Sequence, residues 1–253
     1  MASSQTELGA SVGLPDPTLL PANLPQLEGL DLQVRYQSDR CGGDFFDGRA
    51  IGSRVVFLLT NIAGRPSEAH AIAVEVQNTF RTRAQELFGP LDANESEGIA
   101  SLARDVNLSL IQAAHGVRFA DAFLGCFNLT LGILTYHNAG RLLALFHDAV
   151  SVRILETGGI PLGLFTHSTY EPAVLAFEPR AKLLLVTKGI PESRRGAKVS
   201  GNERVKRFFE NVNTDSAAEI CEAVLRDAND SLRPRKQRRG DDLTAVTLVR
   251  GAQ

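Results

Sequence analysis

The sequence has few cysteines, no strong excess of charge and no long apolar run. Its three cysteines, Cys41, Cys126 and Cys221, are far apart and form no CxxC pair, which argues against a disulfide framework and against a zinc site. A formal net charge of -2 argues against a nucleic-acid-binding protein, which is usually clearly basic. No segment approaches the ~20 apolar residues of a transmembrane helix, and the N-terminus lacks the basic and apolar regions of a secretory signal. We therefore expect a cytoplasmic protein with reduced thiols that binds neither nucleic acid nor a membrane.

Length and composition fit a single domain. The chain has 253 residues, a size that β-rich sandwiches reach as one domain. Hydrophobic residues make up 43% of the sequence, which is enough for a substantial core. Residues 1–16 are small and polar and are interpreted as a flexible leader. Residues 17–253 are expected to form the folded domain.

The hydrophobic pattern predicts strands, a helical pair, more strands, two further helices and a closing strand. Residues 30–37 alternate in polarity, and residues 53–60 form the continuous apolar run of a strand covered on both faces. Apolar residues recur at helical spacing from Pro66 to Phe88 and again over 96–114. The remaining expected elements are strands at 122–129, 132–139, 141–148, 151–156, 173–178, 182–187 and 242–250, and helices at 202–211 and 216–232. This order predicts an α+β fold, a four-layer αββα sandwich of two antiparallel sheets flanked by helical pairs.

Two polar segments lie close to the predicted N-terminal strands. CGGDFFD (41–47) places Asp44 after two glycines that permit a sharp turn. The same composition is typical of an ordinary β-turn. TNIAG (60–64) places Asn61 at the end of the buried strand, a common position for a functional side chain and also for a turn residue.

Two more polar segments lie near the C-terminus. TKGIPE (187–192) places Lys188 at the end of an apolar strand, where an ammonium group either has a partner or is solvated, since burying it alone is costly. GDDLT (240–244) places Asp241 and Asp242 before the last strand. Paired acids in this position either bind a divalent cation or cap the strand.

The order and context of these segments are more specific than any one of them. They resemble the bacterial PPM-type (protein phosphatase 2C-like) phosphatases of the sporulation protein E and RsbU-like branch, which read GGDFYD, GDVSG, NAGH, GLPLG, TDGVTE and a late DD. The resemblance covers roughly residues 18 to 250 and includes an upstream TLLPANLP. The corresponding segments here, in the same order, are GGDFFD (42–47), TNIAG (60–64), NAGR (138–141), GIPLG (159–163), TKGIPE (187–192) and GDDLT (240–244).

The resemblance implies hydrolysis of phosphoserine and phosphothreonine by two Mn²⁺ or Mg²⁺ ions, which activate a bridging water and take oxygen ligands. By position, Asp44, Asp241 and the backbone carbonyl of Ile62 match metal ligands of the family. Asn61 and Lys188 stand where the family has aspartates. A neutral amide bridges two cations poorly, and a protonated lysine has no lone pair. Two divalent cations would therefore leave a strong positive excess in this cleft.

These departures predict a catalytically impaired homologue, a pseudophosphatase in which Mn or Mg binding is weakened or lost and no catalytic residue is assigned. Lys188 is expected near Asp44 and Asp241, where its charge replaces that of a metal ion. The resemblance implies a role in signalling by protein binding, with a phosphorylated anti-sigma-factor antagonist as the type of partner.

The alternative is an active Mn/Mg-dependent protein phosphatase with a reduced or substituted metal site. Its substitute ligands would come from Asp47, Asp121 or Asp242. Arg141 replaces the histidine of the NAGH segment. The basic run RPRKQRRG (233–240) is interpreted as a solvated loop, with attraction of a phosphorylated partner as the functional reading.

Overall fold

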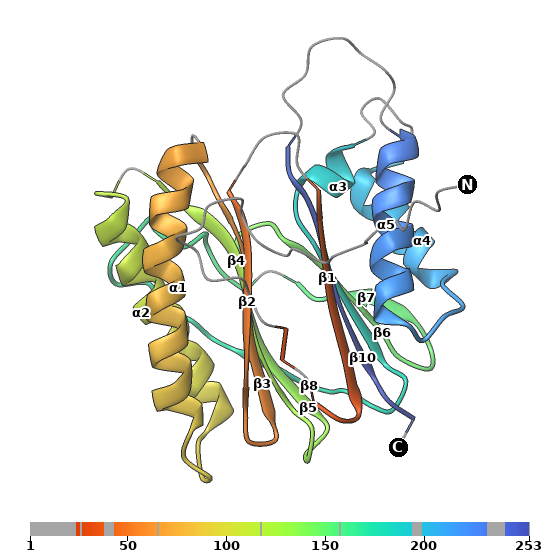
Figure 1. Ribbon diagram of the computed structural model, residues 1–253, viewed down its shortest axis with the longest axis horizontal. Coiled ribbons are helices and arrows are strands. Elements are labelled where there is room, and N and C mark those ends of the chain that lie inside the picture. The colour runs from red at the N-terminus through yellow and green to blue at the C-terminus, as the bar shows by residue number, and fades with distance from the viewer. Residues whose placement is uncertain are drawn as a thin grey trace, which may run out of the picture.

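The computed structural model describes residues 24–25, 27–37, 43–64, 66–116, 118–156, 158–193, 199–231 and 241–252. The expected leader at 1–16, Cys41 and the basic run at 233–240 lie outside these residues. Two sheets stack face to face in the middle of the molecule, and helices cover the outer face of each (Figure 1). This arrangement confirms the predicted α+β sandwich of four layers.

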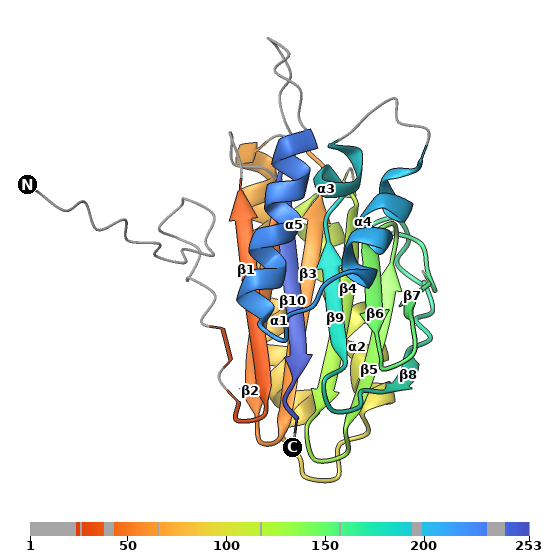
Figure 2. The same ribbon diagram turned by 90° about the vertical axis from the view of Figure 1, so that its right-hand side faces the viewer.

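The first sheet has the order β1-β10-β9-β6-β7, and every neighbouring pair is antiparallel. Its outer face is covered by α4 and α5, with the short α3 at one end, as Figure 2 shows. The strands are β1 (Leu30–Gln37), β6 (Leu143–His147), β7 (Val152–Ile154), β9 (Lys182–Val186) and β10 (Leu243–Arg250). The helices are α3 (Gly189–Glu192), α4 (Gly201–Glu210) and α5 (Ala217–Ser231).

The second sheet has the order β2-β3-β4-β5-β8 and is also antiparallel throughout. The long helices α1 (Pro66–Phe88) and α2 (Glu95–Ala113) pack side by side on its outer face (Figure 1). The side chain of Asn94 caps α2 by accepting the backbone N–H groups of Ser96 and Glu97. The strands are β2 (Asp44–Ile51), β3 (Arg54–Ile62), β4 (Ala120–Asn128), β5 (Ile133–Ala139) and β8 (Ala173–Ala176).

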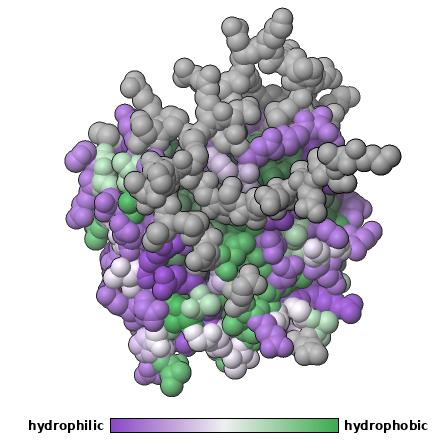
Figure 3. Space-filling view, viewed as in Figure 1, coloured by the Kyte–Doolittle hydropathy of each residue, from purple (hydrophilic) through white to green (hydrophobic). Residues whose placement is uncertain are grey.

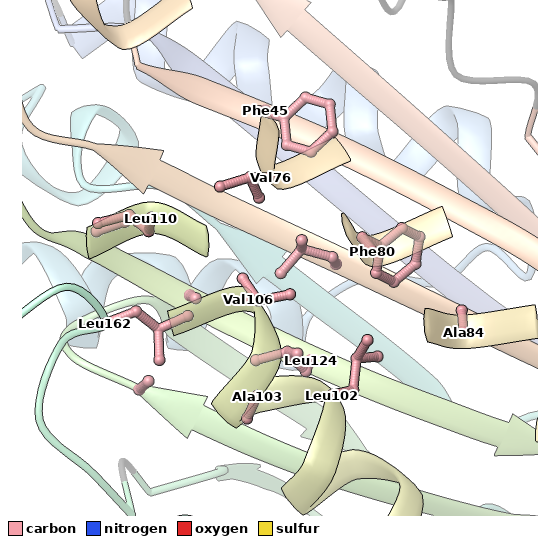
Figure 4. Packing of buried hydrophobic residues seen from close by; sticks show 14 of the residues in the cluster. Phe45, Val76, Phe80, Ala84, Leu102, Ala103, Val106, Leu110, Leu124 and Leu162 are labelled. Carbon is pink, nitrogen blue, oxygen red and sulfur yellow. The ribbon is translucent and has the colours of Figure 1, made fainter. Parts of the chain in front are cut away.

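Three apolar layers result from the alternation of side chains along the strands. In β3, Val55 and Phe57 point into the layer between the sheets, whereas Val56 and Leu58 point toward α1 and α2. Figure 4 shows the helical side of this packing, where Phe80 and other helix residues lie over the sheet. A third layer joins the first sheet to α4 and α5. Burial of each of the large apolar side chains stabilises the folded state by about 1.5–3 kcal/mol.

The outer surface is polar over the helical layers. Figure 3 shows hydrophilic residues on both helical sides and hydrophobic residues along the edge between the two sheets. Among the described residues, no helix combines the length and apolar character that crossing a membrane requires.

The structure differs from the sequence prediction at two places that carry polar motifs. Asp44 does not sit in an isolated turn, because it begins an eight-residue strand, β2. The segment after β9 forms the short helix α3, where no helix was expected. Both differences change the direction in which charged side chains point.

Candidate functional site

A row of polar side chains closes one end of the layer between the sheets. Asp44 on β2 pairs with Asn61 on β3, and Asn61 pairs with Asp121 on β4. Directly paired residues project to the same face of a sheet. Each lies two positions from a residue of the inter-sheet core, so all three side chains face the first sheet.

Two threonines of the first sheet complete this row. Thr244 belongs to β10, and Thr187 directly follows β9 and donates its N–H to the Thr244 carbonyl at 3.1 Å. Each lies two positions from an inter-sheet core residue, Val246 or Leu185, so both hydroxyls face the second sheet. We call Asp44, Asn61, Asp121, Thr187 and Thr244 the inter-sheet polar row.

The carboxylate of Asp44 is surrounded by neutral donors. The hydroxyls of Thr187 and Thr244 each donate to its Oδ2 at 2.6 Å, and the Asn61 amide donates to its Oδ1 at 2.5 Å. Only 2% of the residue is exposed. Burial raises the pKa of Asp44 to about 7; the three hydrogen bonds oppose this shift and the charge of Asp242 adds to it. Hydrogen bonding thus occupies both carboxylate oxygens.

Asp121 lies at the other end of the row and is half-buried. Its Oδ1 accepts the backbone N–H of Arg141 at 3.1 Å. Burial raises the pKa of Asp121, and the nearby charges of Arg141 and Lys188 oppose that shift. Gly140 has a φ of +95°, and a Cβ there would lie 2.0 Å from Asp121 Oδ1. The glycine of the NAGR segment therefore lets the chain turn against this carboxylate.

The glycine before Asp44 permits a close approach of two backbones. The N–H of Ile62 donates to the Gly43 carbonyl at 2.8 Å. A Cβ on Gly43 would lie 1.9 Å from the Ile62 carbonyl oxygen. The Ile62 carbonyl, an expected ligand position, is therefore packed against the backbone that leads into Asp44.

The two adjacent acids before β10, Asp241 and Asp242, lie in different environments. Asp242 is buried, and its Oδ2 accepts the backbone N–H of Asp44 at 3.4 Å. Asp241 is exposed. Asp242 is therefore the acid of this pair that the structure brings against Asp44, whereas position in the motif had pointed to Asp241.

Lys188 does not stand beside Asp44, which corrects the expectation from the sequence. Its side chain is 56% exposed, and its Nζ lies 3.8 Å from Glu192 Oε1. The chain enters α3 at the next residue, and this turn carries the side chain toward Glu192 one helical turn later. The charge of Lys188 acts on Asp121 instead.

Asp47 faces the opposite side of β2 from Asp44. Three positions separate the two acids, so alternation places Asp47 toward α1. Arg81 of α1 pairs with it through two nitrogens, Nε at 2.6 Å and Nη2 at 3.3 Å. This placement removes Asp47 from the substitute ligands, whereas Asp121 and Asp242 remain near the expected site.

Among the residues that the structure describes, no group of three or more histidine, cysteine, aspartate or glutamate side chains is arranged to hold a metal ion. The carboxylates of the site are instead spread along the row. Asp44 and Asp121 flank the uncharged Asn61 on adjacent strands.

Sequence reasoning gave no role to Thr187 and Thr244. The available signal was the alternation of side chains, since each threonine is two residues from a buried leucine or valine of the same strand run. That pattern shows which face each hydroxyl occupies. It does not show that Asp44 lies opposite.

Comparison with known proteins finds relatives in sequence and in fold. The family model of stage II sporulation protein E (SpoIIE) matches residues 51–250. Protein IcfG of Synechocystis sp. is 24% identical over 257 residues, a match that spans 91% of this chain and 39% of IcfG. The chain thus corresponds to well under half of that relative.

Two solved structures have a similar fold. The RsbU and RsbW domains of Rv1364c from Mycobacterium tuberculosis align with a TM-score of 0.72 and 22% identity, over 88% of this chain and 60% of that one. The PP2C phosphatase domain of SpoIIE from Bacillus subtilis, solved with a fragment of its regulatory domain, aligns with a TM-score of 0.72 and 14% identity. This second alignment covers 88% of this chain and 62% of that one.

Proposed function

Because this chain belongs to the stage II sporulation protein E family, we propose that it is a catalytically impaired homologue of metal-dependent serine/threonine phosphatases that acts in signalling by binding another protein. The partner we propose is a phosphorylated regulator of the anti-sigma-factor-antagonist type. RsbU-type and stressosome proteins among the structural relatives support a signalling role.

The observation that carries the proposal is the hydrogen bond from the Asn61 amide to Asp44. An ion between these two strands would need lone pairs from both residues, whereas Asn61 presents an N–H donor at 2.5 Å. The two threonine hydroxyls occupy the other Asp44 oxygen. A hard divalent cation prefers several carboxylate oxygens. The residues of this row therefore do not fit a two-metal centre.

The charge around the row supports the same proposal. Lys188 stands at a ligand position of the family, points away from Asp44 and raises the positive charge near Asp121. We propose that neutral hydrogen bonds between the sheets have replaced the ions in joining the two sheets at this end.

A second candidate function is an active phosphatase with a substituted site. The placement of Asp121 beside Asn61, on the same face, favours this alternative. Asp242 adds a further carboxylate at the Asp44 backbone. In this case Asp44, Asp121 and Asp242 would hold Mn²⁺ or Mg²⁺, and Asn61 would turn its amide oxygen toward the ion.

The deciding experiment is calorimetric titration of Mn²⁺ into metal-free protein, with turnover of a phosphoserine peptide measured on the same samples. We expect wild type to show neither saturable Mn²⁺ binding nor turnover. The double variant Asn61→Asp/Lys188→Asp is expected to show saturable Mn²⁺ binding, because it restores two carboxylates at ligand positions of the family.

The matched control is Asn94→Asp/Lys206→Asp. Asn94 is an exposed helix cap that aspartate can replace, and Lys206 pairs with Glu210 four residues later as Lys188 pairs with Glu192. The control should leave metal binding unchanged. Turnover and Mn²⁺ binding by wild type, both lost in Asp121→Asn, would overturn the proposal and establish the substituted site.

A further inference from the structure

The loop 158–171, which carries the GIPLG segment, leaves the sandwich after β7 and returns just before β8. Its two ends lie close together, because a Cβ on Gly158 would lie 3.8 Å from the Glu171 carbonyl oxygen. Surface loops whose ends meet in this way are compact units and are frequently functional.

The side chain of His137 on β5 lies where the two ends of the loop meet. Its Nδ1 is 3.1 Å from the Glu171 carbonyl oxygen. The ring of Tyr170 meets the imidazole edge-on, with ring centroids 5.3 Å apart. At the other end of the loop, a Cβ on Gly159 would lie 2.8 Å from His137 Nε2. One side chain therefore packs against both the first and the last residues of the loop.

The hydrogen bond to Glu171 determines which nitrogen of His137 carries the proton. A carbonyl oxygen can only accept, so Nδ1 donates and Nε2 carries the lone pair. His137 is 1% exposed, and Nε2 has no hydrogen-bond partner within the described part of the chain. A second proton would therefore bury both a positive charge and an N–H group without an acceptor, which is costly.

The strands and the helix around His137 supply no charge that would balance a protonated ring. On β4, Leu124 pairs with His137, and Cys126 on the same face is a buried thiol whose pKa is raised by burial. The buried face of α2 is apolar apart from Asn107. The residues of β8 are AVLA, none of which titrates.

The loop itself supplies no balancing charge either. Burial raises the pKa of the Tyr170 hydroxyl, which stays neutral. The side chains of His167 and Glu171 are exposed. Burial accordingly lowers the pKa of His137, and the hydrogen bond to the Glu171 carbonyl opposes this shift.

The loop is also connected to the inter-sheet polar row. Ala120 and Leu162 exchange two backbone hydrogen bonds, each of 2.9 Å, and Leu162 is buried in the core beneath α2 (Figure 4). The N–H of Gly140 donates to the Gly159 carbonyl at 3.0 Å. Gly140 directly precedes Arg141, whose N–H binds the carboxylate of Asp121. Movement of the loop would therefore reach one end of the row.

We propose that His137 is a pH switch: while neutral it holds both ends of the loop 158–171 on the second sheet, and its protonation releases them. Release lets water reach Nε2 and hydrate the new charge, which the closed loop cannot do. Buried histidines act as switches of this kind in mildly acidic solution. The inference depends neither on metal binding nor on the partner of the proposed function.

Acid should open the loop. The pKa of His137 is lowered while the loop is closed and returns to about 6.5 when the ring is exposed. The stability of the closed loop is therefore fully present above pH 6.5 and is lost as the pH falls below that value. Asp44 cannot cause this loss, because its raised pKa favours the folded form as the pH falls.

Amide hydrogen exchange, measured by NMR as protection factors at pH 7.5 and pH 5, tests the switch. The reporters are the N–H groups of Gly158, Leu162 and Gly163, which all donate out of the loop. Their protection should fall by about 10- to 30-fold at pH 5, which is about 1.5 units below the pKa of an exposed histidine, at tenfold per unit. The N–H of Gly132 in the β4–β5 turn is the internal reference and should keep its protection.

Two variants remove the titration of His137. In His137→Asn the amide keeps a donor near the place of Nδ1, and in His137→Phe the ring keeps its shape. Both should have the same loop protection at the two pH values, within about twofold. A purely structural role of His137 would instead change the protection by the same factor at both pH values and leave the dependence on pH intact.

The matched controls are His147→Asn and His167→Asn. His147 on β6 also has a pKa lowered by burial, and its buried Nδ1 has no hydrogen-bond partner within the described residues. His167 is an exposed histidine of the same loop. Both controls should retain the loss of protection seen in wild type.

The inference would be overturned if loop protection in wild type were the same at pH 7.5 and pH 5. It would also be overturned if both His137 variants kept the wild-type loss, or if His147→Asn abolished it. An equal loss at Gly132 would overturn it as well, since the acid would then unfold the sheet rather than open the loop.

Discussion

The two faces of strand β2 each carry a buried carboxylate, one with a charged partner and one with uncharged partners. Toward α1, Asp47 is 0% exposed and has a cationic partner, Arg81. Toward the first sheet, Asp44 is nearly as buried, but its side-chain partners are Asn61, Thr187 and Thr244, which carry no charge. Neutral donors satisfy the lone pairs of a carboxylate without balancing its charge, so Asp44 retains a pKa of about 7.

One face of β2 therefore stabilises the fold through an acid with a counter-charge, Asp47. The other face keeps an acid without a counter-charge, Asp44, available for function. A buried group with a strongly shifted pKa costs stability at neutral pH, and such groups concentrate at functional sites. The GGDFFD segment thus supplies one acid to each role. Three predictions test this difference between the two faces.

The largest expected effect is on the helix-facing side. Arg81→Met should lower the free energy of unfolding by about 3–5 kcal/mol, because it leaves Asp47 buried without a counter-charge. Urea denaturation at pH 7 measures this loss. Arg83→Met removes a half-exposed arginine of the same helix and should cost less than about 1 kcal/mol. Equal losses in the two variants would remove the distinction between the faces.

On the inner side, Asp44→Asn should stabilise the chelator-treated protein at pH 8 by about 2–4 kcal/mol. Folding raises the pKa of Asp44 from 3.8 to about 7. Between these two pH values the folded protein therefore binds more protons than the unfolded chain. Wild-type stability from this group is therefore present below pH 4 and is lost as the pH rises through 7. Asparagine does not titrate, so the difference between the variants should vanish near pH 4.

Denaturation curves from pH 4 to pH 8 measure this difference. Asp241→Asn is the control, since Asp241 is exposed, and it should show no comparable trend. A stability difference between wild type and Asp44→Asn that stays constant across this range would contradict the raised pKa.

The smallest effect concerns a single hydroxyl. Thr187→Val should cost about 1–2 kcal/mol at pH 8, because it removes a donor to a buried charge, and less at pH 5, where the carboxyl is protonated. Thr60→Val is the control: within the described part of the chain, the buried Thr60 hydroxyl has no hydrogen-bond partner. Thermal denaturation should show little or no loss in Thr60→Val, and a loss as large as that of Thr187→Val would contradict this account.

Much of the fold could be predicted from the sequence because its signals are local. The helix predicted from Pro66 to Phe88 has the bounds of α1, and the apolar run at 53–60 lies within the interior strand β3. Strand β2 was missed because Gly42, Gly43 and Asp44 are typical turn residues. Its pairing with β3, which extends to Asn61, overrides that preference.

The residues of the candidate site could be predicted only in part from the sequence. Asp44, Asn61 and Asp121 were each identified, and the structure places them side by side. Lys188 was placed wrongly beside Asp44, because the short helix α3 turns its side chain to Glu192. Asp47 and Asp241 were named as well, but one faces α1 and the other faces solvent.

By itself the sequence determined the family motifs, their order and the loss of two carboxylates at Asn61 and Lys188. Only the tertiary structure decided that Thr187, Thr244 and Asn61 would all donate to Asp44 and that Asp242 would lie at its backbone. The physical reason is that residue type is a local property. Burial, hydrogen bonding and pKa depend on strand register and on what the facing sheet brings from more than a hundred residues away.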